Sequence, residues 1–100
     1  MSELPSLEEM AAKAERLDQA RLALKRDLAE RVVYGRDAGE LVEVGVDTSA
    51  NVIEVAVNAS LVGRVDPAVL ANAVLQAASA AQRNARELVA ERRSYYLGTK

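Results

Sequence analysis

Residues 41–58 read LVEVGVDTSANVIEVAVN, a stretch in which apolar and polar side chains alternate, pause over residues 47–51 and then alternate again. Successive side chains of a strand point to opposite faces, so this pattern predicts two strands that each have one apolar face. The short turn between them favours antiparallel pairing. The apolar face is expected to carry Val42, Val44 and Val46 from the first strand and Ile53, Val55 and Val57 from the second.

A further strand is predicted just before this hairpin. Residues 31–34, Arg-Val-Val-Tyr, are β-branched and aromatic, and residues 35–39 contain two glycines and an aspartate that favour a turn. The sequence therefore predicts a three-stranded antiparallel sheet over about residues 31–58. Such a sheet packs one face on helix.

An N-terminal helix is predicted over about residues 6–30. Ser6 and Glu9 have the spacing of a capping box, in which each side chain bonds to the backbone N–H of the other residue. Apolar residues recur three and four apart, interrupted at Arg21: Leu7, Met10, Ala14, Leu17, Leu24 and Leu28. A helix of this length reaches roughly 36 Å, which is longer than a small sheet can cover. We therefore expect part of it to project.

A second long helix is predicted over about residues 67–96, after a connector at residues 59–66. Asp66 is a good N-cap residue, Pro67 suits the first helical position, and Gly98 suits the stop. The middle of this helix is rich in alanine, which allows close approach to a sheet. The expected buried stripe consists of Leu70, Ala73, Val74, Ala77, Ala81, Ala85 and Leu88. Together the elements predict a single α+β domain over residues 1–100.

The residue types argue against catalysis. The chain has no histidine and no cysteine, and proton transfer near pH 7 usually uses a histidine, a perturbed carboxylate or a lysine in a pocket. Nucleophile motifs, phosphate-binding glycine-rich loops and metal-ligand clusters are absent from the sequence. Asp37, Glu40 and Glu43 gather near a turn, but they lack the spacing of a calcium loop. We expect a non-enzymatic protein with no cofactor and no bound metal.

The composition also limits the core and the compartment. Three tyrosines are the only aromatic residues, so burial must come from valine, leucine and alanine, which remove less area per residue. A partner chain would enlarge so small a core. The N-terminus lacks the basic and apolar regions of a signal peptide, and no apolar run approaches the roughly 18 residues that span a bilayer. We expect a soluble, cytoplasmic protein without a membrane partner.

Charge is segregated along the chain, although the net charge is only -2. Residues 37–66 carry six acids and one arginine, whereas residues 12–36 carry seven bases and four acids, and residues 67–100 carry five bases and two acids. The sheet region is acidic and the helices are basic. Arginine suits phosphate oxygens as well as carboxylates. Ordinary solvated helix faces with ion pairs, such as Arg83 with Glu87, would also explain these counts.

The hairpin and its surroundings resemble the YbaB/EbfC family of small bacterial nucleoid-associated proteins. Residues 39–47, GELVEVGVD, are followed at a fixed distance by residues 53–61, IEVAVNASL. The order of a charged helix, a glycine-containing turn, the hairpin, a connector and an alanine-rich helix is also similar. The similarity covers roughly residues 6–95.

This resemblance implies a homodimer that forms through its sheet region, with helices projecting like the arms of tweezers. The six apolar residues of the hairpin, from Val42 to Val57, would then form the dimer interface. The charged helices would contact double-stranded DNA with little sequence preference. The matching positions are Arg16, Arg21, Lys25 and Arg26 in the first helix and Arg83, Arg86, Arg92 and Arg93 in the last.

Two functions follow from these observations. The first is a nucleoid-associated, homodimeric DNA-binding protein whose basic helical arms contact duplex phosphates. The second is a homodimeric protein-interaction module that does not bind DNA, which the acidic total and the alanine-rich helix favour. Both functions require dimerisation.

Overall fold

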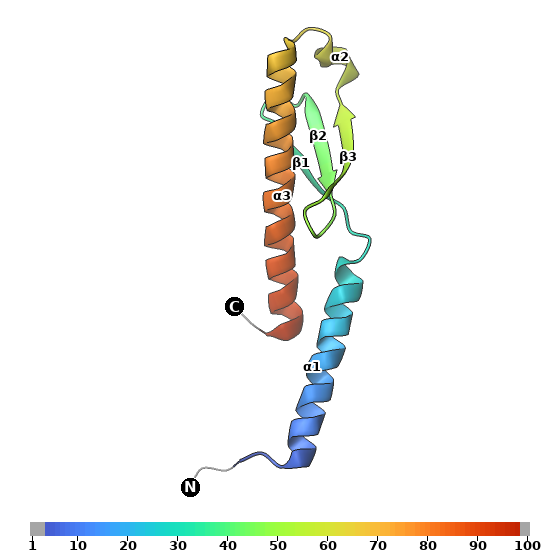
Figure 1. The fold of residues 1–100 in the computed structure, drawn as a ribbon, viewed down its shortest axis with the longest axis vertical. Helices are drawn as coiled ribbons and strands as arrows, with labels where there is room; N and C mark the ends of the chain where they lie inside the picture. The colour runs from blue at the N-terminus through green and yellow to red at the C-terminus, as the bar shows by residue number, and fades with distance from the viewer. Residues whose placement is uncertain (1–3, 99–100) are drawn as a thin grey trace.

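The computed structural model describes residues 4–98. The chain forms α1 (Leu7–Leu28), β1 (Val33–Arg36), β2 (Val42–Val46), β3 (Val52–Val57), α2 (Ala59–Val62) and α3 (Pro67–Leu97), as Figure 1 shows. The strands make one antiparallel sheet in the order β1-β2-β3. The predicted α+β architecture of a long helix, a three-stranded antiparallel sheet and a second long helix is confirmed.

The ends of the long helices follow local sequence signals. The Glu9 backbone N–H donates to Ser6 Oγ at 3.1 Å, and the Ser6 backbone N–H donates to Glu9 Oε1 at 3.4 Å, which completes the predicted capping box. Pro67 is the first residue of α3, although the side chain of Asp66 forms no capping hydrogen bond. Gly98 ends α3 in the left-handed conformation, with φ 66, which glycine adopts without steric cost.

The first strand and the connector differ from the sequence prediction. Strand β1 begins at Val33, two residues later than expected, and it includes Gly35, which was assigned to the turn. The turn lies further along the chain because the buried Asp37 carboxylate organises it, accepting from Gly39 N–H at 3.1 Å and Val42 N–H at 2.8 Å. The connector contains the short helix α2, where Asn58 caps the N-terminus by accepting from Ser60 N–H at 3.1 Å.

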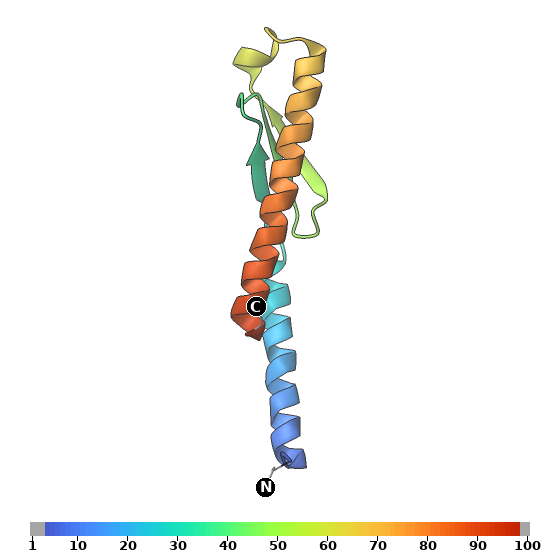
Figure 2. The ribbon, with the colours of Figure 1, turned by 90° about the vertical axis from the view of Figure 1, so that its left-hand side faces the viewer.

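Helix α3 lies across β1 and β2 and makes the core with them (Figure 2). Four buried alanines at four-residue spacing face the sheet: Ala73, Ala77, Ala81 and Ala85. Gly35 lies directly beneath this stripe, and a Cβ added to it would collide with Ala81 N and stand 2.6 Å from Ala77 O. The helix backbone therefore approaches the strand more closely than any side chain at position 35 would allow.

The apolar face of the hairpin is divided between the core and the surface. The side chains of Val42, Val44 and Val46 are packed under α3 in the protomer, with 2%, 0% and 0% of their areas exposed. They expose almost no surface in the protomer, and the dimer contact expected for them stays a prediction. Val55 and Val57 pair with Val44 and Val42, yet every residue of β3 is exposed because α3 covers only β1 and β2.

Helix α1 projects as expected. Residues 7–19 are all exposed, and only the last turns of the helix pack on α3, where Leu24 is buried. In Figures 1 and 2 its N-terminal half extends past the C-terminal end of α3. The radius of gyration is 20.5 Å, against about 13 Å for a compact domain of this length.

An ion-pair network built on Asp27 fixes α1 to α3. Arg92 of α3 donates from Nε to Asp27 Oδ2 at 2.8 Å, and Arg31 donates from Nε to Asp27 Oδ1 at 2.8 Å. Only 7% of the Asp27 side chain is exposed. A hydrogen bond with Tyr96, followed by those from Arg92 and Arg31, lowers the pKa of Asp27 from 3.8 to about 2, while burial opposes the shift. The carboxylate is therefore charged at every physiological pH.

The contact between Gly35 and α3 predicts a destabilising substitution. Gly35→Ala should lower the free energy of unfolding by about 1–3 kcal/mol, because the helix or the strand must move to admit the methyl group. The matched control is Gly63→Ala, since an added Cβ there meets nothing within 4 Å. Urea unfolding monitored by circular dichroism gives the free energy of unfolding of both variants. Equal stability would contradict the close contact.

The Asp27 network predicts a pH-dependent contribution to stability. Folding lowers the pKa of Asp27, so its charged form stabilises the folded state. This contribution to the free energy of unfolding is complete above the ordinary pKa of 3.8 and is lost as the pH falls toward about 2. Asp27→Asn should lower Tm at pH 7, and its difference from wild type should shrink across that acid range. The control is Asp18→Asn, whose carboxylate is 76% exposed and 3.9 Å from Arg21. A pH-independent difference would rule out the proposed linkage.

Candidate nucleic-acid interface

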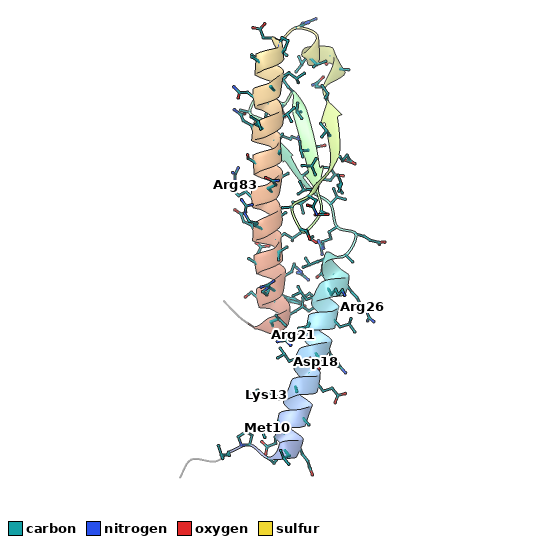
Figure 3. The ribbon with its side chains drawn as sticks, viewed as in Figure 1. Met10, Lys13, Asp18, Arg21, Arg26 and Arg83 are labelled. Carbon is teal, nitrogen blue, oxygen red and sulfur yellow. The ribbon has the colours of Figure 1, made fainter. Side chains whose placement is uncertain are left out.

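The solvent face of α3 carries three arginines. Arg83, Arg86 and Arg93 are exposed and separated by three and seven residues, which places them on one side of the helix, opposite the alanine stripe. In Figure 3 Arg83 lies on the side of α3 away from the sheet. Within residues 4–98 none of the three forms an ion pair, so their guanidinium groups are available to an external anion.

Arg92, the fourth arginine predicted on this helix, has a different environment. Its side chain is 30% exposed and bonds to Asp27, and its guanidinium carbon lies 4.6 Å from the centre of the Tyr95 ring. The hydrogen bond with Asp27 is the main cause that raises the pKa of Arg92. The structure thus gives Arg92 a role in joining the helices. Sequence reasoning missed this pair because its members are 65 residues apart.

The bases of α1 are exposed but do not share one face. Arg21 and Lys25 are four residues apart on one side, whereas Arg16 lies nine residues from Lys25 and therefore on the other side. Arg26 points away from α3 in Figure 3. Arg21 lies within 3.9 Å of an Asp18 carboxylate oxygen. The first helix consequently offers dispersed positive charges, in contrast to the single arginine face of α3.

The ion pairs of the described residues bear on the alternative explanation of the charge counts. The predicted pair of Arg83 with Glu87 is not formed between residues 4 and 98, where the ion pairs join Arg21, Arg31, Arg36 and Arg92 to acids. Intrahelical ion pairing therefore does not account for the bases on α3.

The outer face of the sheet, turned away from α3, is acidic and internally paired. Arg36 donates from Nε to Glu43 Oε2 at 2.8 Å, and this hydrogen bond is the main cause that raises the pKa of Arg36. A hydrogen bond with Glu54 raises the pKa of Tyr34. These carboxylates disfavour an approaching polyanion. Over the part of the chain that the structure describes, no three acidic, histidine or cysteine residues are arranged to hold a metal ion.

One groove is lined by residues that the sequence analysis did not place near each other. Its volume is about 420 Å³, and it lies between the end of β1 and the outer side of α3. Arg36 and Arg83 line it together with Asn72, Leu75, Gln76, Ser79 and Ala80. No sequence signal predicted that Arg36 lies near the basic face, because the pairing of β1 beneath α3 brings it there.

The described part of the chain contains no helix that is both long enough and apolar enough to cross a membrane. Helix α1 carries five bases and five acids, and α3 carries four arginines and two glutamates, whereas residues 37–66 carry six acids and one arginine. Of the two long helices, α3 therefore has the excess of positive charge, and the sheet region has the excess of negative charge.

Comparisons with known proteins concern the fold and the family of the chain. The chain has the fold of the uncharacterized protein HP0035 from Helicobacter pylori, with a TM-score of 0.62 at 12% sequence identity, over 95% of this chain and 96% of that one. No curated protein sequence matches the chain significantly. A sequence profile of the YbaB/EbfC DNA-binding family matches residues 3–99. The chain therefore belongs to the YbaB/EbfC DNA-binding family.

Proposed function

We propose that the protein is a homodimeric nucleoid-associated factor of the cytoplasm that contacts DNA phosphates with little sequence preference. The observation that carries the proposal is the solvent face of α3, where Arg83, Arg86 and Arg93 have no ion-pair partner among residues 4–98. Membership of a DNA-binding family supports DNA as the anion. The exposed bases of α1, namely Arg16, Arg21, Lys25 and Arg26, would add contacts around the same duplex.

Phosphates suit this surface better than base edges. Long, exposed arginine side chains can follow phosphate oxygens without a fixed register, which gives affinity but no sequence information. Two of the three tyrosines, Tyr95 and Tyr96, pack edge to face with their ring centres 5.0 Å apart beside Arg92, and the Glu54 carboxylate raises the pKa of Tyr34. Tyr95 is 71% exposed, but the guanidinium of Arg92 lies over its ring and Tyr96 packs edge to face against it. Weak sequence preference follows.

The open edge of β3 supports dimerisation. Among residues 4–98 this strand pairs only with β2, so the backbone groups along its other edge have no strand partner there. Ile53, Val55 and Val57 are 54%, 51% and 45% exposed. A second copy that pairs along this edge would satisfy the backbone and bury these side chains. It would also hold two α3 helices at a fixed spacing.

A protein-interaction module without DNA binding is the second candidate. The observation that favours it is the acidic sheet together with a net charge of -2, which opposes binding to a polyanion at long range. This candidate shares the dimer and differs only in the role of the arginine face. DNA binding at low salt distinguishes the two.

The arginine face predicts a salt-dependent interaction. Mobility-shift titrations with a duplex should show affinity falling between about 50 and 200 mM salt. Substituting Arg83, Arg86 and Arg93 together by alanine should lower the affinity about tenfold or more at the lower salt and should flatten the salt dependence. Arg64→Ala, at an exposed position between α2 and α3, should leave both unchanged. A triple variant that binds like wild type would refute the phosphate mechanism.

The edge of β3 predicts a dimer that one charge disrupts. Val55→Lys should yield a folded monomer in analytical ultracentrifugation at micromolar concentration, because the side chain is exposed in the protomer and would be buried in the proposed dimer. The same substitution at Ala56, which pairs with Glu43 on the opposite face, is the control and should remain dimeric. The dimer hypothesis fails if wild type sediments as a folded monomer.

A further inference from the structure

The β2–β3 turn is hydrogen-bonded internally and to both long helices. Asp47 Oδ1 accepts from the backbone N–H groups of Ser49 and Asn51, each at 2.9 Å. The Thr48 hydroxyl donates to Leu28 O at the end of α1, and Gln82 Nε2 of α3 donates to Ala50 O, each at 3.2 Å. The turn consequently has a fixed position relative to α3.

A groove of about 410 Å³ lies between this turn and the part of α3 that follows Gln82. The turn contributes Thr48, Ser49 and Ala50, and the helix contributes Arg86, Val89, Ala90 and Arg93. Arg86 and Arg93, two of the three arginines on the solvent face of α3, therefore border this groove, and Val89 and Ala90 give it an apolar lining. None of the described residues that line the groove is acidic.

The spacing of the two arginines suggests the size of the ligand. Arg86 and Arg93 are seven residues apart, which corresponds to roughly 10 Å along the helix axis. Their long side chains can converge from that separation on two neighbouring phosphates. Guanidinium groups bind phosphate oxygens in pairs of hydrogen bonds, and the apolar floor between them suits the carbon atoms of a sugar.

From this geometry we propose that the groove holds one sugar–phosphate step of a DNA strand, which makes the β2–β3 turn a third DNA-contacting element beside α1 and α3. The inference rests on the proposed function, because it names where the backbone of the bound DNA lies. The turn needs no rearrangement to take part, since its hydrogen bonds to α1 and α3 are already formed.

A charge placed in the turn tests the groove without altering α3. Ser49→Asp adds one negative charge at an exposed position in the groove, and Ser60→Asp adds the same charge at an exposed position in α2. Duplex affinity at about 50 mM salt should fall about tenfold for Ser49→Asp and less than about twofold for Ser60→Asp. Equal losses would overturn the proposal. If wild type does not bind the duplex, the proposed function itself fails.

Chemical-shift titration of the ¹⁵N-labelled full-length protein identifies the ligand. A 5′-phosphorylated thymidine dinucleotide should shift the amides of Ser49, Ala50 and Ala90, and Arg86→Ala with Arg93→Ala should abolish these shifts. Inorganic phosphate at the same concentration should produce less than half of the effect. Equal shifts with inorganic phosphate would replace the sugar–phosphate assignment by a simple anion site. A duplex that binds wild type without moving these amides would exclude the groove.

Discussion

The close contact between the alanine stripe of α3 and the sheet determines most of this structure. Gly35 removes the side chain that would separate the helix from β1, and the small methyl groups of Ala77 and Ala81 let the backbone come near. The remaining space is filled by valines of β2, so the core needs no aromatic residue. Because the helix is centred over β1 and β2, its opposite side points to solvent, and Arg83, Arg86 and Arg93 are presented there.

A core this thin leaves apolar surface uncovered. The single helix layer reaches β1 and β2 but not β3, so the same alternating pattern that buries Val44 exposes Val55 beside it. The protomer is also extended, with a longest dimension of 73 Å, because α1 projects beyond the single helix layer. The close helix packing and the exposure of β3 thus have the same cause.

Periodicity in the sequence predicted which residues share a face, but not what covers that face. The hairpin, the capping box of Ser6 and the alanine stripe depend on local spacing, and all three are present. The prediction of a dimer contact at Val42, Val44 and Val46 did not include the cover that α3 gives β2 in the same protomer. Likewise, the assignment of Arg92 to DNA lacked its distant partner, Asp27. Local spacing in the sequence does not say which strand of the hairpin α3 covers, because that depends on how the helix packs on the whole sheet.

The Asp27 network also explains how a helix can project into solvent. An isolated helix of about 13 residues is marginal in water because its first turn is costly to form, whereas each added residue costs little. The C-terminal turns of α1 are held on α3 by Asp27 and Arg92, so they supply the nucleus from which the exposed half extends. At the N-terminus of α1, the capping box of Ser6 and Glu9 provides hydrogen-bond partners for backbone N–H groups. The bases of α1 are therefore carried on a helix whose direction and stability both derive from its contact with α3.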